Sequence, residues 1–187
     1  DIYDSFWAPM EFAFNQPKNK NLFEPFLKDY LTIQNNGEIP NDSELYSEFI
    51  RFFNEKLTIQ SRKDVLSHVY KYSRYYLKVV HNDIDDPEIH RAIQQINLLG
   101  AKDAYPFLME VMEDYENGLI NAEILGEILK TVESFIHKRI NSEDKSTFSS
   151  LSKNINKMLA LRDFTPRIIE EDEVQPVRIK DLIRVNE

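Results

Sequence analysis

The four histidines are the residues best suited to acid–base catalysis or metal binding, because imidazole changes its charge near neutral pH and ligates metal ions. They are spread over different parts of the 187-residue chain, at His68, His81, His90 and His137. None belongs to an H-E-x-x-H motif or to a pair spaced by four residues, the arrangements that place two zinc ligands together on one helix face. The chain also lacks cysteine, which excludes thiolate ligands, thiol nucleophiles and disulfides. The sequence therefore predicts no metal site.

An acidic cluster at Asp83, Asp85 and Asp86 resembles the start of a calcium-binding loop. In such a loop the sixth position must be glycine for the sharp turn, and the twelfth must be a bidentate glutamate. Here those positions hold Glu88 and Gln94. We therefore interpret the aspartates as capping residues for the helix that follows.

Glycine-rich phosphate loops are excluded by the positions of the four glycines, which are never close together: Gly37, Gly100, Gly118 and Gly126. The serines between residues 142 and 152 lack the G-x-S-x-G frame of a hydrolase nucleophile. We expect neither a catalytic residue nor a cofactor within this chain, so any enzymatic activity would depend on other segments.

Positive charge is concentrated in one predicted helix, although 23 basic and 32 acidic residues give the chain a net charge of −9. Residues 62–80 have five basic and one acidic side chain, a local charge of +4 that leaves −13 for the rest. Helical spacing puts four of these side chains on one broad face, with Tyr75 beside them: Lys63, Lys71, Arg74 and Lys78. This face could follow the phosphates of DNA with a stacking tyrosine, or it could be a solvated face or a dock for an acidic segment.

A second basic cluster, His137-Lys138-Arg139, ends a predicted helix over residues 121–141. Lys138 and Arg139 are candidate contacts for nucleic acid or a neighbouring domain. The first turns of the same helix contain Glu123 and Glu127, and acids first with bases last is the order that the helix macrodipole favours. Helix stability alone is therefore an alternative explanation for this cluster.

Apolar residues recur at spacings of three and four along most of the chain, which predicts an all-α, irregular bundle of about seven to nine helices. The predicted apolar stripes, in chain order, are Phe23, Phe26, Leu27, Tyr30 and Leu31; Leu45, Tyr46, Phe49, Ile50 and Phe53; Val65, Val69, Tyr72, Tyr76 and Val80; Ile89, Ile93, Ile96 and Leu99; Phe107, Leu108, Val111 and Met112; and Ile124, Leu125, Ile128, Leu129, Val132, Phe135, Ile136 and Ile140. Start and stop signals support it: Asp42 or Ser43 as an N-cap, Ser61 with Asp64 as a capping box, Asp86-Pro87 before a helix, and Gly100 after it. A further amphipathic helix is predicted over residues 146–161. We expect a helical domain over residues 1–165 and a charged tail, or the start of another segment, over residues 166–187.

The chain begins at Asp1, without methionine, in a pattern that already looks helical, which favours an excised part of a longer protein. No stretch is long and apolar enough for a membrane span, and a signal peptide is not evident, so we expect a cytoplasmic location without a membrane partner. Phe6, Trp7, Phe12 and Phe14 are too crowded for one narrow stripe, so some of this aromatic surface should be exposed or buried against another copy in a homo-oligomer.

An ordered set of short motifs resembles the helical region of the domain of unknown function 262 family, which includes GmrSD-type modification-dependent restriction endonucleases. The similarity covers roughly residues 7–157. Its motifs are Phe26-Leu27-Lys28-Asp29-Tyr30-Leu31-Thr32, the turn from Gly37 to Pro40, Leu45-Tyr46-x-x-Phe49, Tyr72-x-x-Tyr75-Tyr76, Tyr105-Pro106-Phe107-Leu108 and Glu133-Ser134-Phe135-Ile136-His137-Lys138-Arg139-Ile140. Family members usually have two adjacent arginines before the last of these positions, where this chain has Lys138 and Arg139.

The resemblance implies that an N-terminal ParB-like domain with nucleotide-dependent activity precedes this region and that an HNH-type nuclease domain follows it. On that basis we expect a non-catalytic helical module that couples those two domains, its partners being the missing domains and, as a second candidate, the DNA backbone. Two alternatives stay open: a free-standing protein-interaction domain with no defence role, and a fragment that completes an active site in the missing domains.

Overall fold

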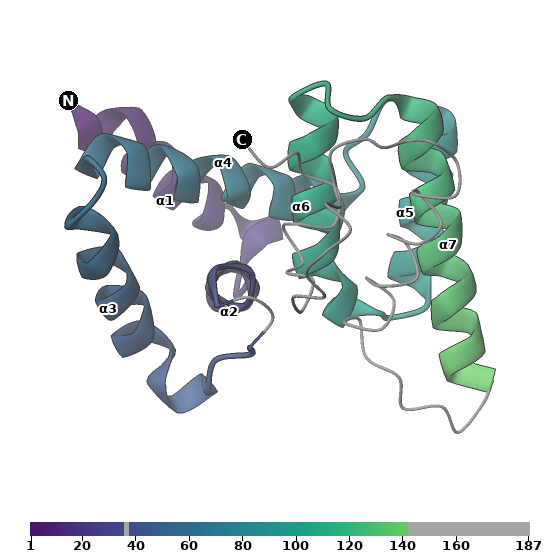
Figure 1. The fold of residues 1–187 in the computed structure, drawn as a ribbon, viewed down its shortest axis with the longest axis horizontal. Helices are drawn as coiled ribbons and strands as arrows, with labels where there is room; N and C mark the ends of the chain where they lie inside the picture. The colour runs from purple at the N-terminus through teal and green to yellow at the C-terminus, as the bar shows by residue number, and fades with distance from the viewer. Residues whose placement is uncertain (36–37, 142–187) are drawn as a thin grey trace, which may run out of the picture. The chain divides into compact units, whose positions relative to one another are not determined.

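Seven α-helices make up the computed structural model, which describes residues 1–35 and 38–141 (Figure 1). No strand occurs in those two ranges, so the predicted all-α class is confirmed. The helices are α1 (Ala8–Phe14), α2 (Phe23–Gln34), α3 (Leu45–Leu57), α4 (Arg62–His81), α5 (Pro87–Leu98), α6 (Tyr105–Glu116) and α7 (Ala122–Asn141). A π-helical turn (Tyr3–Trp7) leads into α1, and short 3-10 turns occupy Pro17–Asn19, Asp42–Glu44 and Lys102–Ala104. The helix predicted over residues 146–161 and the tail over 166–187 lie outside the described residues.

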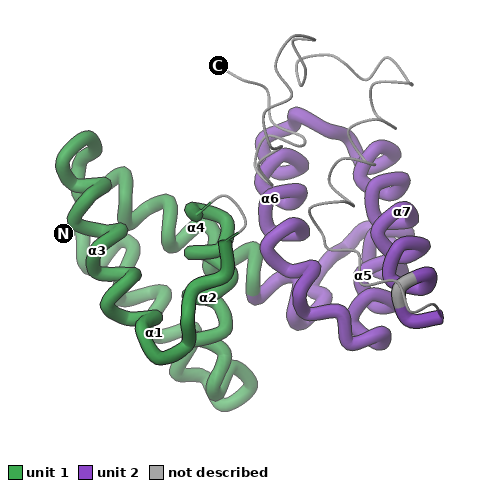
Figure 2. The backbone as a smooth tube through the Cα atoms, turned by 60° about the horizontal axis from the view of Figure 1, so that its bottom comes forward, with its two compact units in different colours: residues 1–76 green, residues 77–187 purple. Residues whose placement is uncertain are grey.

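The chain divides into two compact units, Asp1–Tyr76 and Leu77–Glu187, with the division inside α4 (Figure 2). The boundary predicted near residue 165 lies outside the part of the chain that the structure describes. Within that part, no helix is long and apolar enough to cross a membrane.

Unit 1 is held together by an aromatic core. Phe26 of α2 is fully buried and contacts Phe14, Tyr30 and Tyr76, with ring centroids 5.4, 5.9 and 5.7 Å away. These rings come from α1, α2 and α4, so one side chain links three helices. Large buried rings provide much of the apolar area that stabilises a small helical unit. The stripe predicted on α2 is confirmed for Phe26, Leu27, Tyr30 and Leu31, which are buried, whereas Phe23 is partly exposed.

Unit 2 packs α5 against α7 through aliphatic side chains that the predicted stripes include: Ile89, Ile93 and Ile96 on α5, and Leu125, Ile128, Leu129, Val132 and Ile136 on α7. Helix α6 is different, because every residue over 105–114 is buried. These residues include three acids, Glu110, Glu113 and Asp114. The sequence predicts one apolar stripe on this helix, and burial on all sides goes beyond that prediction.

The predicted capping residues are mostly confirmed. The Ser61 hydroxyl accepts a hydrogen bond from the Asp64 amide at 3.1 Å, and the Asp86 carboxylate accepts from the amides of Glu88 and Ile89. Gly100 ends α5 with φ = +69°, a conformation that side chains other than glycine disfavour. One prediction is wrong: neither Asp42 nor Ser43 caps α3. Asn41 caps the 3-10 turn Asp42–Glu44 that leads into α3, because its side-chain oxygen accepts a hydrogen bond from the Ser43 amide at 3.2 Å. Glu44, the residue before α3, makes no capping hydrogen bond with its side chain.

Candidate functional site

The basic face of α4, defined as Lys63, Lys71, Arg74 and Lys78, lies opposite the buried stripe of the same helix. Val65, Val69, Tyr72 and Tyr76 are all buried, as their spacing predicts. Lys63 and Arg74 are exposed, whereas Lys71 and Lys78 are partly covered. Three of the four residues belong to unit 1, and Lys78 belongs to unit 2.

Lys78 forms an ion pair with Glu116, the last residue of α6. Its Nζ lies 2.6 Å from Oε1 of Glu116, and the two side chains are 35% and 40% exposed. The acid is unfavourably placed with respect to its own helix, since the C-terminal end of α6 has the negative pole of the macrodipole. A cation beside it relieves that repulsion. One end of the basic face is thus occupied by an acidic residue of the same unit.

Glu116 is a contact residue that the sequence interpretation missed. The signal that could have found it is an acid in the last turn of α6 with no basic residue in that turn, because such a helix end favours a cation from elsewhere in the fold. The two partners are 38 residues apart in sequence. Local periodicity therefore could not identify the pair.

Tyr75 does not have the stacking role proposed for it. Its side chain is only 7% exposed and its ring contacts Tyr72, with centroids 5.5 Å apart. Stacking on an unpaired base needs an open aromatic face. Tyr75 is therefore buried beside the apolar stripe of α4, and this position gives the basic face no exposed aromatic residue.

Lys138 and Arg139 lie near the end of α7, in unit 2. Lys138 is exposed, and of Arg139 the structure describes the helical backbone only. The neighbouring His137 has its Nε2 3.8 Å from a Glu133 carboxylate one turn earlier.

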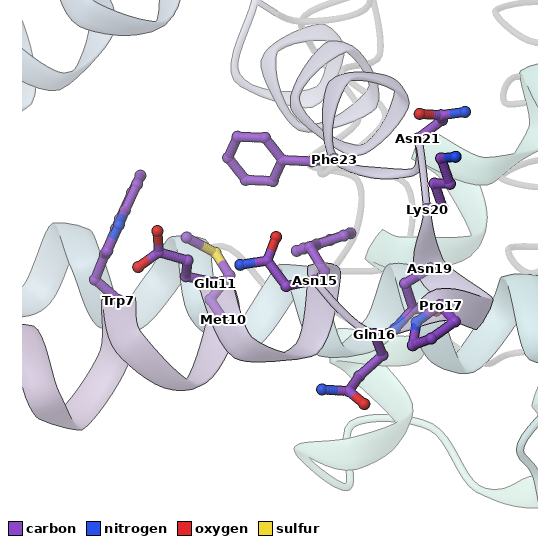
Figure 3. Close-up of a pocket in the computed structure, with 11 residues that line it drawn as sticks. Trp7, Met10, Glu11, Asn15, Gln16, Pro17, Asn19, Lys20, Asn21 and Phe23 are labelled. Carbon is purple, nitrogen blue, oxygen red and sulfur yellow. The ribbon is translucent and has the colours of Figure 1, made fainter.

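Unit 1 contains a pocket of about 470 Å³ that the sequence did not indicate (Figure 3). It lies between α1, the loop after it and the start of α2. Its apolar wall comes from Trp7, Met10, Phe14, Pro17 and Phe23, and its polar wall from Glu11, Asn15, Gln16, Asn19, Lys20 and Asn21. This volume suits a small ligand, and the mixed lining is typical of small-molecule sites.

Ring contacts and hydrogen bonds hold several of the side chains that line the pocket. The rings of Trp7 and Phe23 lie at 84° to each other with centroids 6.5 Å apart. The Glu11 carboxylate accepts a hydrogen bond of 2.9 Å from the Tyr3 hydroxyl, which raises the pKa of Tyr3 above its usual value. Asn19 is buried and donates to the Ala13 carbonyl at 2.6 Å, holding the loop on α1.

No group of three or more histidine, aspartate or glutamate side chains among the described residues is arranged to hold a metal ion. Within the described residues, the fold is all-α, α4 has a basic face, and unit 1 contains a pocket with a mixed lining. Comparison with protein families, with curated proteins and with solved structures finds no match to this chain.

Proposed function

We propose that this chain is a non-catalytic helical coupling module of a GmrSD-like restriction protein. In this role it connects a ParB-like, nucleotide-dependent domain to a nuclease domain. The helical fold supports the proposal, because rigid helices transmit a change at one surface to another without large rearrangement of their own packing.

The single observation that favours this function most is where the residues of the family resemblance lie. In unit 1 they include the fully buried Phe26, Leu27 and Tyr72, and in unit 2 the fully buried Phe107 and Ile136. The pattern is thus mainly one of core positions, which specify a scaffold, while the chemistry of such a protein would belong to its other domains.

The basic face of α4 gives the module a contact surface. Because Lys78 is already bound to Glu116, an acidic protein surface is a partner that this face is able to accept. Lys63 and Arg74 are exposed and also suit phosphate groups. We favour a domain contact as the main role of this face and a DNA backbone contact as its second.

The proposal is tested by the reading frame and by the activity of the full-length protein. We expect a ParB-like segment upstream, an HNH motif downstream, and nucleotide-dependent cleavage of modified DNA by the full-length protein. The 187-residue chain alone should have neither nucleotidase nor nuclease activity. A reading frame without both flanking domains, or turnover by the purified chain that a point substitution within it abolishes, would overturn the proposal.

A free-standing interaction domain is the second candidate, favoured by large apolar side chains that are more than half exposed. Three of them lie on or just after α3: Tyr46, Ile50 and Ile59. Exposed apolar side chains that gather on one surface mark contact sites. A reading frame limited to this helical region would favour this candidate over the coupling module.

A further inference from the structure

Helix α3 has two apolar stripes, of which unit 1 uses one. The single stripe predicted for this helix is therefore wrong for Tyr46 and Ile50, which are exposed. Leu45, Phe49 and Phe52 are buried, and the ring of Phe52 meets Tyr30 of α2 edge-on with centroids 5.7 Å apart. The second stripe consists of Tyr46, Ile50, Phe53 and Leu57. Tyr46 and Ile50 are 52% and 60% exposed, and the other two are partly exposed.

The second stripe has the spacing of a coiled-coil seam. Its members follow one another at intervals of four, three and four residues, which places them alternately at the two core positions of a heptad repeat. The intervals of four, three and four residues read the same from either end of the helix. When a second copy of the helix packs antiparallel to the first, each apolar residue of one stripe can therefore lie opposite an apolar residue of the other.

On the side away from the buried stripe, the residues next to the second stripe are uncharged. Helical spacing puts Ser47 and Asn54 beside the second stripe, and both are exposed. In a chain with a net charge of −9, most surfaces repel another copy of the same chain. An uncharged flank beside exposed apolar residues removes this repulsion at α3, and depletion of charge is the compositional mark of an interface core.

Tyr46 can be covered without leaving a polar group unsatisfied. Its hydroxyl donates a hydrogen bond of 3.0 Å to the Glu24 carboxylate of α2, which holds the ring across the surface. An approaching helix would then bury the ring while the hydroxyl keeps its partner, which avoids the cost of an unpaired buried donor. Figure 2 shows α3 along the edge of unit 1.

We propose that two copies of this chain associate through α3, packed antiparallel about a two-fold axis near the middle of the helix. Tyr46 then meets Leu57 of the partner subunit, and Ile50 meets Phe53 of the partner subunit. Ser47 lies opposite Asn54 of the partner subunit. Two helices of this length bury on the order of 800 Å² in total, less than a standard interface, so the association is reversible. This contact is independent of the coupling role proposed above.

The test is the oligomeric state of the 187-residue chain, measured by sedimentation velocity from low micromolar to millimolar concentration. We expect the weight-average mass to rise with concentration toward that of a dimer. Ile50→Lys should weaken the association at least about tenfold, because it puts a charge in the centre of the seam. Leu98→Lys, at a 74% exposed position of unit 2, is the matched control and should change it by no more than about twofold.

A charge design tests the antiparallel arrangement itself. Ser47→Lys with Asn54→Glu places opposite charges across the two-fold axis and should strengthen the dimer, whereas Ser47→Lys with Asn54→Lys should weaken it. In parallel packing each of these positions would lie opposite the same position of the partner subunit. Like charges would then meet, and the first variant would weaken the dimer. A mass that stays monomeric at millimolar concentration, or an association that Ile50→Lys and Leu98→Lys change equally, would overturn the proposal. Circular dichroism of each variant shows whether its helices are intact.

Discussion

The hydroxyl of Tyr30 lies 2.8 Å from Nδ1 of His68, a residue 38 positions later in the chain. Tyr30 is buried on α2, and His68 is partly exposed on α4, where its ring stacks on Tyr72 with centroids 4.5 Å apart. A hydrogen bond between two helices fixes their register in a way that apolar contacts alone do not. The histidine is therefore part of the core of unit 1.

Tyr30→Phe should lower the free energy of unfolding by about 1 kcal/mol, because it removes the hydroxyl and leaves the imidazole nitrogen without this hydrogen bond. Urea denaturation followed by circular dichroism measures the change. Tyr70→Phe, on the same helix as His68 but only partly buried, is the control and should change it by less than about 0.5 kcal/mol. Equal effects of the two substitutions would show that the Tyr30 hydroxyl does not stabilise the unit.

The ion pair between Lys78 and Glu116 should contribute little stability, because each side chain is more than a third exposed. We expect a coupling energy of about 0.5 kcal/mol from a double-mutant cycle with Lys78→Gln and Glu116→Gln, decreasing as salt is added. The Arg51 and Glu55 pair, 4.0 Å apart and more exposed, is the comparison and should give a coupling energy near zero. A coupling energy above about 2 kcal/mol would contradict a screened surface pair.

The sequence predicted most of what depends on neighbours along a helix. The stripe of Val65, Val69, Tyr72 and Tyr76 is buried, and Asp86 caps α5. These features arise from side-chain spacing and from hydrogen bonds within one turn, so the local sequence contains them.

Features that depend on residues distant in the chain were not predicted. Tyr75 was expected on the surface, but its side chain is buried and its ring contacts Tyr72. Glu116 reaches Lys78 from another helix, and the pocket beside Trp7 arises where α1 and α2 meet the loop between them. Periodicity along a single helix does not specify which helices become neighbours, and these three features all follow from that.

Asp86→Ala should lower the free energy of unfolding by about 1 kcal/mol. The Asp86 carboxylate accepts hydrogen bonds from the amides of Glu88 and Ile89 at 3.0 and 3.1 Å, and alanine would leave both without this acceptor. Asp85→Ala removes the same charge one residue earlier, at an exposed position, and serves as the control. Urea denaturation of both variants gives the comparison. If the two lose the same stability, charge at this helix start matters and capping does not.

If the basic face of α4 contacts DNA in the full-length protein, substitutions in this face should change the salt dependence of the binding affinity. If it meets phosphates, Lys63→Gln with Arg74→Gln flattens the slope of log affinity against log salt by up to about two units, because two fewer counterions are released. Arg91→Gln with Lys102→Gln removes the same charge from exposed positions in unit 2 and should leave the slope unchanged. Equal slopes for both variants would reject the DNA contact and leave the domain contact as the role of this face.

Tyr3 and Tyr46 both have a raised pKa, but for different reasons, and substitution of their carboxylate partners should separate the two. The hydrogen bond to Glu11 is the largest cause for Tyr3, followed by the negative charge of that carboxylate. For Tyr46 the largest cause is loss of hydration, and the hydrogen bond to Glu24 comes second. Glu11→Gln should therefore return the pKa of Tyr3 close to its ordinary value, whereas Glu24→Gln should lower the pKa of Tyr46 only in part.

The measurement is an NMR titration of tyrosines labelled at the ring carbon that bears the hydroxyl, at low protein concentration, with Tyr3→Phe and Tyr46→Phe to assign the signals. A raised pKa means that the folded state holds the phenolic proton more tightly than the unfolded state does. The resulting stabilisation is complete below the ordinary tyrosine pKa of 10.0 and is lost as the pH rises through the raised value of the folded protein. If Glu24→Gln restores Tyr46 as completely as Glu11→Gln restores Tyr3, then the carboxylate and not burial controls the pKa of Tyr46, and the ring is more hydrated than its place on α3 implies.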